Sequence, residues 1–348
     1  MASSVDNSAW LAWMATLMGE ASRQTYASTL PPGRFHCLLD ELPLHLIPQP
    51  ALAQLRLREK AQSHLFLNPD CIFCPAGQLP PALESVRELV SGFSLQGTIA
   101  WVRDPATGSL RPFWLGPELE AAIRALRTGK TMPSALPATT CTVLSHAGVL
   151  VSDNHAELRR REWKKAVEGS APYFQGKGYA PLTNLIHPFH VAALRRYYRY
   201  LIRTGAIQLG DRQSARRYVA YNEPVARFFH HQIATTLSAL AGEPLKPSYV
   251  YMASYLSGAE LKKHIDREQC EFSVTLCLDF SPEPALESPW PIRLESPTGT
   301  VTVHQALGDG LVYRGTRLPH YRGVLGEGQT STSIFFHYVR AGFAGSLD

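Results

Sequence analysis

The sequence predicts an α+β protein in which a smaller N-terminal α+β domain precedes a C-terminal double β-sheet with supporting helices. Two observations predict the sheet. Beyond residue 246 the chain is a run of short strand-like segments separated by Pro and Gly turns, and no helical periodicity interrupts that run. A third observation, three helix-like segments directly upstream of these strands, predicts the supporting helices.

The strand-like segments are rich in aromatic and β-branched residues. The first, 247–256, ends at Ser257 and Gly258. The second, 271–280, places apolar residues at every other position, which predicts a strand with one buried face. Five further strands are predicted, at 291–295, 299–304, 310–314, 320–325 and 332–339. Such a run is typical of antiparallel sheets packed face to face.

Three helices are predicted before the strands, at 156–167, 189–203 and 223–241. The third has Pro224 in its first turn and stops before Gly242, which are common start and stop signals. In the second, apolar residues share one helical face, so that face is predicted to be core.

Positive charge is concentrated in the same region. The whole chain has a formal net charge of +5, but residues 156–217 hold thirteen Lys or Arg against four Asp or Glu. The arginines of the second predicted helix recur at helical spacing: Arg195, Arg196, Arg199 and Arg203. We expect either a basic face that attracts an acidic partner or an ordinary solvated helix face. No nucleic-acid-binding motif accompanies this charge.

The N-terminal part differs in character. Residues 1–30 are predicted to be an arm or short helix, and 31–152 an accessory α+β domain with a hairpin at 97–115 and helices at 117–127 and 134–147. This order loosely resembles the winged-helix-like leader-recognition modules of peptide-modifying enzymes. The alternative is a cap or dimerisation domain. The second domain would then span 153–348.

Composition sets further limits. A chain of 348 residues with 45% apolar content predicts two domains with packed cores. No apolar run approaches the roughly eighteen residues of a membrane span, and no secretory signal precedes the first domain. Six scattered cysteines favour a reduced, cytoplasmic protein. The Cys71–Cys74 step has no second pair at zinc-finger spacing, so we expect two ordinary thiols.

The main candidate site is an H-x-D step, His264 and Asp266, followed about fifty residues later by His320. Two histidines and one carboxylate are the ligand set of the non-haem iron(II) facial triad, which leaves three metal positions open for an organic co-substrate and O2. An H-x-D step can also arise by chance in a surface turn. The strands that flank it favour the metal site, because neighbouring strands could bring the two histidines together.

Residues 183–339 resemble the Fe(II)- and 2-oxoglutarate-dependent oxygenases, on the prolyl 4-hydroxylase-like branch. The matching features are a tyrosine strand and a glycine before the H-x-D step, a Gly-Asp step before a strand, the distal histidine, and a closing strand. They stand here as Tyr255, Gly258, His264, Asp266, Gly308, Asp309, His320 and 333–339. The resemblance implies a double-stranded β-helix, or jelly roll. It also implies His264, Asp266 and His320 as ligands of Fe(II), with 2-oxoglutarate and O2 as co-substrates and ascorbate as a reductant.

One feature departs from the family pattern. The family places an Arg or Lys about ten residues after the distal histidine, where it binds the far carboxylate of 2-oxoglutarate, and this chain has none there. Arg322 is the first substitute, because residues two apart on a strand share a face and a guanidinium binds a carboxylate through two hydrogen bonds. The alternative for Arg322 is a surface residue paired with Glu327. The other candidates for co-substrate binding are Tyr255, Thr330, Ser333 and, as second-choice cation, Arg314.

Three hypotheses about function follow. The first is hydroxylation of an unactivated C–H bond of an amino-acid residue in a peptide or protein that the N-terminal domain recognises. The second is the same chemistry on a free or carrier-bound small molecule in a biosynthetic pathway. The third is a non-catalytic jelly-roll binding protein, which the missing cation favours and the complete triad disfavours. The basic region suggests an acidic substrate for either enzyme, and no membrane partner is expected.

Overall fold

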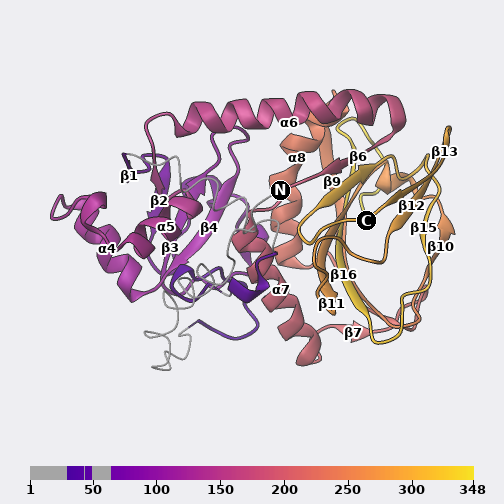
Figure 1. Cartoon of the computed structure of the whole chain (residues 1–348), viewed down its shortest axis with the longest axis horizontal. Coiled ribbons are helices and arrows are strands. Elements are labelled where there is room, and N and C mark those ends of the chain that lie inside the picture. The colour runs from indigo at the N-terminus through magenta and orange to yellow at the C-terminus, as the bar shows by residue number, and fades with distance from the viewer. Residues whose placement is uncertain (1–29, 43, 49–63) are drawn as a thin grey trace, which may run out of the picture.

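The computed structural model describes residues 30–42, 44–48 and 64–348, so the predicted N-terminal arm lies outside the described residues except for Leu30. Two bodies of β-structure lie at opposite ends of the molecule, with the helices α7 (Pro188–Arg203) and α8 (Pro224–Ala241) between them (Figure 1). The long helix α6 (His155–Lys177) runs along one side of both. No helix in these described ranges is long and apolar enough to cross a membrane.

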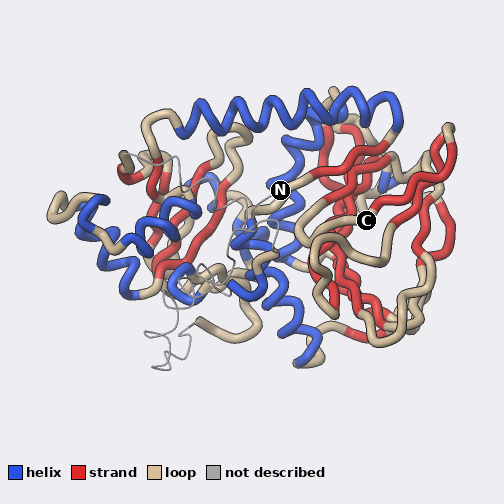
Figure 2. The backbone as a smooth tube through the Cα atoms, viewed as in Figure 1, coloured by secondary structure: helices blue, strands red, loops and turns tan. Residues whose placement is uncertain are grey.

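The C-terminal body consists of two antiparallel sheets (Figure 2). The large sheet has the order β6-β14-β11-β16-β9-β8-β7 and the small sheet the order β10-β15-β12-β13. The strands of the large sheet are β6 (Tyr179–Leu182), β7 (Gln208–Leu209), β8 (Arg217–Tyr221), β9 (Leu245–Leu256), β11 (Phe272–Ser281), β14 (Gly310–Tyr313) and β16 (Thr330–Arg340). Those of the small sheet are β10 (Leu261–His264), β12 (Ile292–Ser296), β13 (Gly299–Val303) and β15 (His320–Arg322).

From β9 onward the chain passes repeatedly between the two sheets, so residues far apart in sequence meet across the space that the sheets enclose. All seven predicted strands are present, with ends shifted by a few residues. The prediction of one buried face for 271–280 is wrong, because β11 is buried on both faces from Phe272 to Phe280. Its alternate residues point into two different interiors, one beneath the helices and one between the sheets.

The N-terminal body is built on a three-stranded sheet of order β2-β3-β4. Its strands are β2 (Cys71–Cys74), β3 (Thr98–Arg103) and β4 (Leu110–Leu115), and β1 (Phe66–Leu67) pairs with β5 (Leu150–Val151) beside them. The helices are α3 (Pro81–Glu84), α4 (Pro117–Arg127) and α5 (Ala138–Ala147). The single helix predicted at 134–147 is instead a 3₁₀ turn and α5, because Pro137 precedes the first turn of α5.

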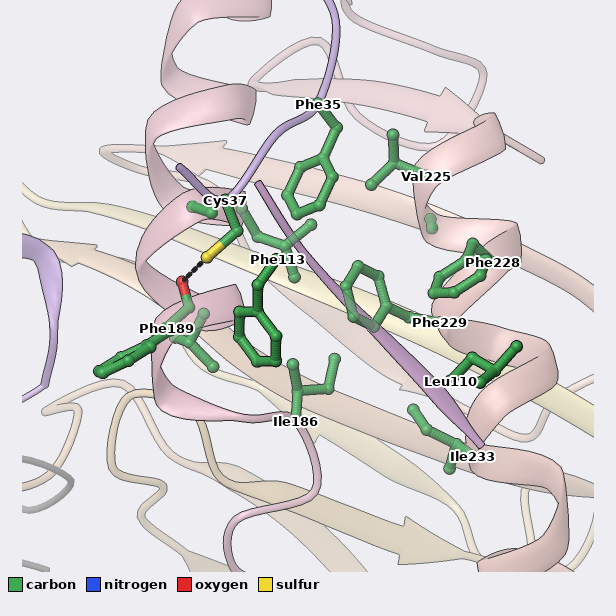
Figure 3. Close-up of a cluster of buried hydrophobic side chains, with 14 of the residues drawn as sticks. Phe35, Cys37, Leu110, Phe113, Ile186, Phe189, Val225, Phe228, Phe229 and Ile233 are labelled. Carbon is green, nitrogen blue, oxygen red and sulfur yellow. Dashed lines mark hydrogen bonds between the residues drawn. The ribbon is translucent and has the colours of Figure 1, made fainter. Parts of the chain in front are cut away.

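One aromatic cluster joins this body to the helices of the C-terminal part. Phe35 packs edge-to-face on Trp114 and on Phe229 of α8, with ring centroids 5.9 Å apart in both pairs. Phe228 packs on Phe93 at 4.8 Å. Figure 3 shows side chains from the N-terminal segment, β4, α7 and α8 meeting in this cluster. The two parts of the chain therefore share a continuous apolar core.

The predicted basic face of α7 is partly an internal ion network. Arg195 is fully buried and donates to Asp279 at 2.9 Å and to Glu283 at 2.6 Å. Arg199, one turn further, donates to the same Asp279 at 2.5 Å. The two arginines therefore fasten α7 to the end of β11, and the interpretation of Arg195 as a solvated or partner-binding residue is wrong.

Candidate metal centre

The structure brings His264, Asp266 and His320 together at one end of the space between the sheets. His264 ends β10 and His320 begins β15, and the two are direct partners in the antiparallel pairing of these strands. Their Nε2 atoms lie 3.6 Å and 3.5 Å from the Oδ1 atom of Asp266. Ligand atoms of all three residues lie within 4.8 Å of one another. Two nitrogens and one oxygen therefore converge on a single point, as a metal ion requires.

Backbone carbonyls orient both imidazole rings. The Nδ1 atom of His264 lies 2.8 Å from the carbonyl oxygen of Lys262, and that of His320 lies 3.0 Å from the carbonyl oxygen of Leu318. Because a carbonyl only accepts, each Nδ1 donates its proton to the backbone, and each Nε2 faces Asp266 and is the nitrogen left for a metal ion. Metal-binding histidines are commonly held in this way.

Asp266 supplies the negative charge of the cluster. Burial alone would raise the pKa of its carboxyl, but hydrogen bonds to His264 and His320 outweigh burial and hold that pKa well below its usual range. The hydrogen bond to Asp266 in turn raises the pKa of His264. An ionised carboxylate beside two imidazoles is an electrostatically favourable site for a divalent cation.

Arg322 lies on β15 two residues after His320 and points into the same interior. It is only 5% exposed, it donates to the Trp290 carbonyl at 2.5 Å and to Gln305 at 3.2 Å, and its guanidinium stacks on the Trp290 ring. Burial lowers its pKa. In the described part of the chain its Nε atom has no partner, and no carboxylate pairs with its guanidinium. The alternative of a surface residue paired with Glu327 is therefore wrong.

The other predicted co-substrate residues divide between the two faces of the large sheet. Tyr255 and Ser333 are buried on the inner face, where Tyr255 packs on Trp290 with ring centroids 5.1 Å apart. Strand alternation places Thr330 on the opposite face, with Ile334 and Phe336 of the helix-side core. Arg314 lies over the rings of Phe174 and Phe272 on that side as well. The structure does not bring Thr330 or Arg314 to the cluster.

Other residues of the inner face were not predicted from the sequence. The Tyr313 hydroxyl lies 3.4 Å from Nε2 of His320, and Ser273 donates to Oδ2 of Asp266 at 2.7 Å. Thr275 is fully buried, and its hydroxyl has no partner among the described residues. Arg217 donates to the Tyr255 hydroxyl at 3.3 Å, although Asp211 neutralises it. The alternation of Ser273 and Thr275 with apolar neighbours was the available signal for two of them.

Comparisons with known proteins find remote likeness only. No protein-family model and no curated protein matches the chain. Among solved structures, the non-haem α-ketoglutarate-dependent epimerase SnoN from nogalamycin biosynthesis is 16% identical with a TM-score of 0.44, over 51% of this chain and 84% of SnoN. A prolyl-4-hydroxylase of Pseudomonas putida is 16% identical with a TM-score of 0.42, over 51% of this chain and 100% of that enzyme.

HygX of Streptomyces hygroscopicus, solved with nickel, 2-oxoglutarate and hygromycin B, is 12% identical with a TM-score of 0.41, over 50% of this chain and 88% of HygX. At these identities and TM-scores the likeness is too remote to assign a function. We therefore infer the function from the side chains of the site.

Proposed function

We propose that this chain is an Fe(II)- and 2-oxoglutarate-dependent oxygenase whose two sheets form a double-stranded β-helix. One observation carries the proposal. A two-histidine, one-carboxylate cluster occupies the same interior as a buried guanidinium that has no carboxylate partner among the described residues, with His320 and Arg322 two residues apart on β15. The cluster fits a metal, and the guanidinium fits the anionic end of a co-substrate.

The metal would be held by Nε2 of His264, Oδ1 of Asp266 and Nε2 of His320. Imidazole and carboxylate suit Fe(II), and three protein ligands on one face leave room for other ligands. His264 is the more accessible of the two histidines, with 39% of its side chain exposed against 3% for His320. The open side of the centre is therefore the side of His264, and we expect the substrate to approach there.

The co-substrate would be held at its far carboxylate by Arg322. This guanidinium donates two hydrogen bonds to protein atoms, so three of its five N–H groups stay available. An isolated buried charge is costly, and an anion would remove that cost. The unpartnered hydroxyl of Thr275 and the buried Tyr255 and Ser333 supply further hydrogen-bonding groups on the inner face. Among the described residues, the unpartnered atoms of Arg322 and Thr275 support a polar guest in this interior.

When bound, iron and 2-oxoglutarate supply the activation of O2 that hydroxylates an unactivated C–H bond, with ascorbate as a reductant that keeps iron in the ferrous state. The protein contributes ligands, orientation and a dry interior. Tyr251, Tyr313 and Phe335 line that interior with aromatic surface, which excludes water from the reacting groups.

For the substrate we propose an amino-acid residue in a peptide or protein, recognised in part by residues 31–152. The shared core between this part and α8 supports the proposal, because it would hold a recognition surface in a fixed position relative to the metal. A free or carrier-bound small molecule is the alternative. Succinate production that purified peptides stimulate and free metabolites do not would support the peptide.

The test of the proposed reaction is succinate formation from 2-oxoglutarate by the purified chain with Fe(II) and air. We expect activity in the wild type and in Cys71→Ser, whose thiol lies on β2 in the N-terminal sheet. We expect none in His264→Ala or His320→Ala, because each loses a metal ligand. Undiminished activity in either histidine variant would remove that residue from the centre, and metal binding without turnover in the wild type would favour a binding protein.

A further inference from the structure

The two oxygens of the Asp266 carboxylate lie in different surroundings. Oδ1 faces the Nε2 atoms of both histidines at 3.5–3.6 Å. Oδ2 faces away from them and accepts a hydrogen bond from the Ser273 hydroxyl at 2.7 Å. One carboxylate oxygen therefore faces the metal position, and the other is hydrogen-bonded to the protein.

Ser273 also contacts a third histidine, and proton counting fixes the direction of the bonds. Its hydroxyl has one proton, which goes to the charged Oδ2 at 2.7 Å and not to the neutral Cys270 carbonyl at 3.4 Å. The Ser273 oxygen must then accept at its other contact, 2.9 Å from Nδ1 of His337. His337 is therefore protonated on Nδ1, and a donor chain runs from His337 through Ser273 to Asp266.

Buried, closely packed residues surround this chain of hydrogen bonds. Ser273 is fully buried and His337 is 2% exposed, and the ring of His337 stacks on that of Tyr251 and packs at a tilt against that of Tyr249. The carbonyl of His337 lies 2.7 Å from Nε2 of His230 on α8. A Cβ atom at Gly315 would lie 2.3 Å from Oδ2 and 2.6 Å from the Ser273 hydroxyl, so only glycine leaves room for the carboxylate in this orientation. The Gly315 carbonyl accepts from the Asp266 backbone N–H at 2.9 Å.

We propose that Ser273 and His337 are positioning residues that keep Asp266 a one-oxygen ligand. The inference rests on the proposed function, in which the metal needs three open positions. A carboxylate released from Ser273 could rotate and bind through both oxygens, and it would then occupy a position that the co-substrate or O2 requires. The donor chain prevents this rotation without touching the metal.

The test uses Co(II) as a spectroscopic probe, because its visible spectrum reports coordination number in the absence of turnover. Ser273→Ala should shift the Co(II) spectrum towards a higher coordination number and change the Co(II) affinity, because the released carboxylate can then bind through both oxygens. Ser273→Thr, which keeps the hydroxyl, should show the wild-type Co(II) affinity and the wild-type spectrum. Tyr338→Phe is the matched control, since the Tyr338 hydroxyl bonds the His230 carbonyl on the helix side of the sheet.

His337 is tested with a pair of variants. Asparagine can place an amide N–H where Nδ1 stands, so His337→Asn should retain Co(II) affinity and spectrum, whereas His337→Leu should shift both in the direction of Ser273→Ala. Wild-type affinity and spectrum in folded Ser273→Ala would overturn the proposal, and the same result in His337→Leu would overturn the part assigned to His337. Failure of the wild type to bind Co(II) would instead refute the metal centre itself.

Discussion

The two faces of β11 border two interiors of opposite character. On the helix side, Phe272, Val274 and Leu276 join a core of apolar and aromatic side chains that continues into the N-terminal body. On the other side, Ser273 and Thr275 face the space between the sheets, together with histidines and an arginine. The side chains of β11 are buried on both faces from Phe272 to Phe280, so burial alone does not explain the different composition of the two interiors.

The difference indicates which interior serves the fold and which serves a ligand. Apolar side chains stabilise a fold in proportion to the area that they bury, whereas buried polar groups cost free energy unless they are paired. The space between the sheets contains polar atoms of Thr275, Arg322 and His337 that have no hydrogen-bond partner among the described residues. Left unpaired, these groups lower the stability of the protein, and a bound anion and metal ion would remove that cost.

The largest expected effect comes from the apolar interior. Trp114 is 1% exposed and packs against Phe35 and Phe93, so Trp114→Ala should lower the free energy of unfolding by about 3–5 kcal/mol. Chemical denaturation measures this, with Met132→Ala at an exposed position as the control. A loss below about 1 kcal/mol would mean that the cluster does not join the two parts of the chain.

Arg322→Met should have the opposite effect to Trp114→Ala: it should weaken co-substrate binding without destabilising the fold. Losing a hydrogen bond to a charged group costs about 1.5–3 kcal/mol, so we expect 2-oxoglutarate to bind roughly 10- to 100-fold more weakly. Stability should be unchanged or higher, because a buried charge without a counter-charge is removed. Calorimetric titration and denaturation measure the two effects, with Arg314→Met as the matched control. Unchanged 2-oxoglutarate affinity would move the co-substrate away from Arg322.

Thr275→Val should likewise weaken 2-oxoglutarate binding without destabilising the fold, by a smaller amount than Arg322→Met. Replacing a buried hydroxyl that has no partner by a methyl group of similar shape should raise the free energy of unfolding by about 1 kcal/mol. If the hydroxyl binds the co-substrate, the affinity for 2-oxoglutarate should fall roughly three- to tenfold. Destabilisation by this change would show that Thr275 is part of an ordinary core.

The sequence predicted the strands and the three residues that the structure brings together, because both depend on local patterns: alternation, turn residues and the H-x-D step. It could not predict contacts that depend on the pairing of distant strands. Ser273 and Thr275 alternate with apolar residues as solvent-facing residues do, and only the second sheet shows that they are buried. Arg195 likewise looked solvated because its partners Asp279 and Glu283 lie more than eighty residues away.

The most direct measurement is an anaerobic titration of the purified chain with Fe(II) and then 2-oxoglutarate, followed by visible absorption. We predict a weak charge-transfer band that appears only when both are present, that is lost in Asp266→Ala, and that needs more 2-oxoglutarate in Arg322→Met. Such a band would establish the triad and the keto-acid co-substrate together. Bound iron without a band at saturating 2-oxoglutarate would contradict the proposed oxygenase.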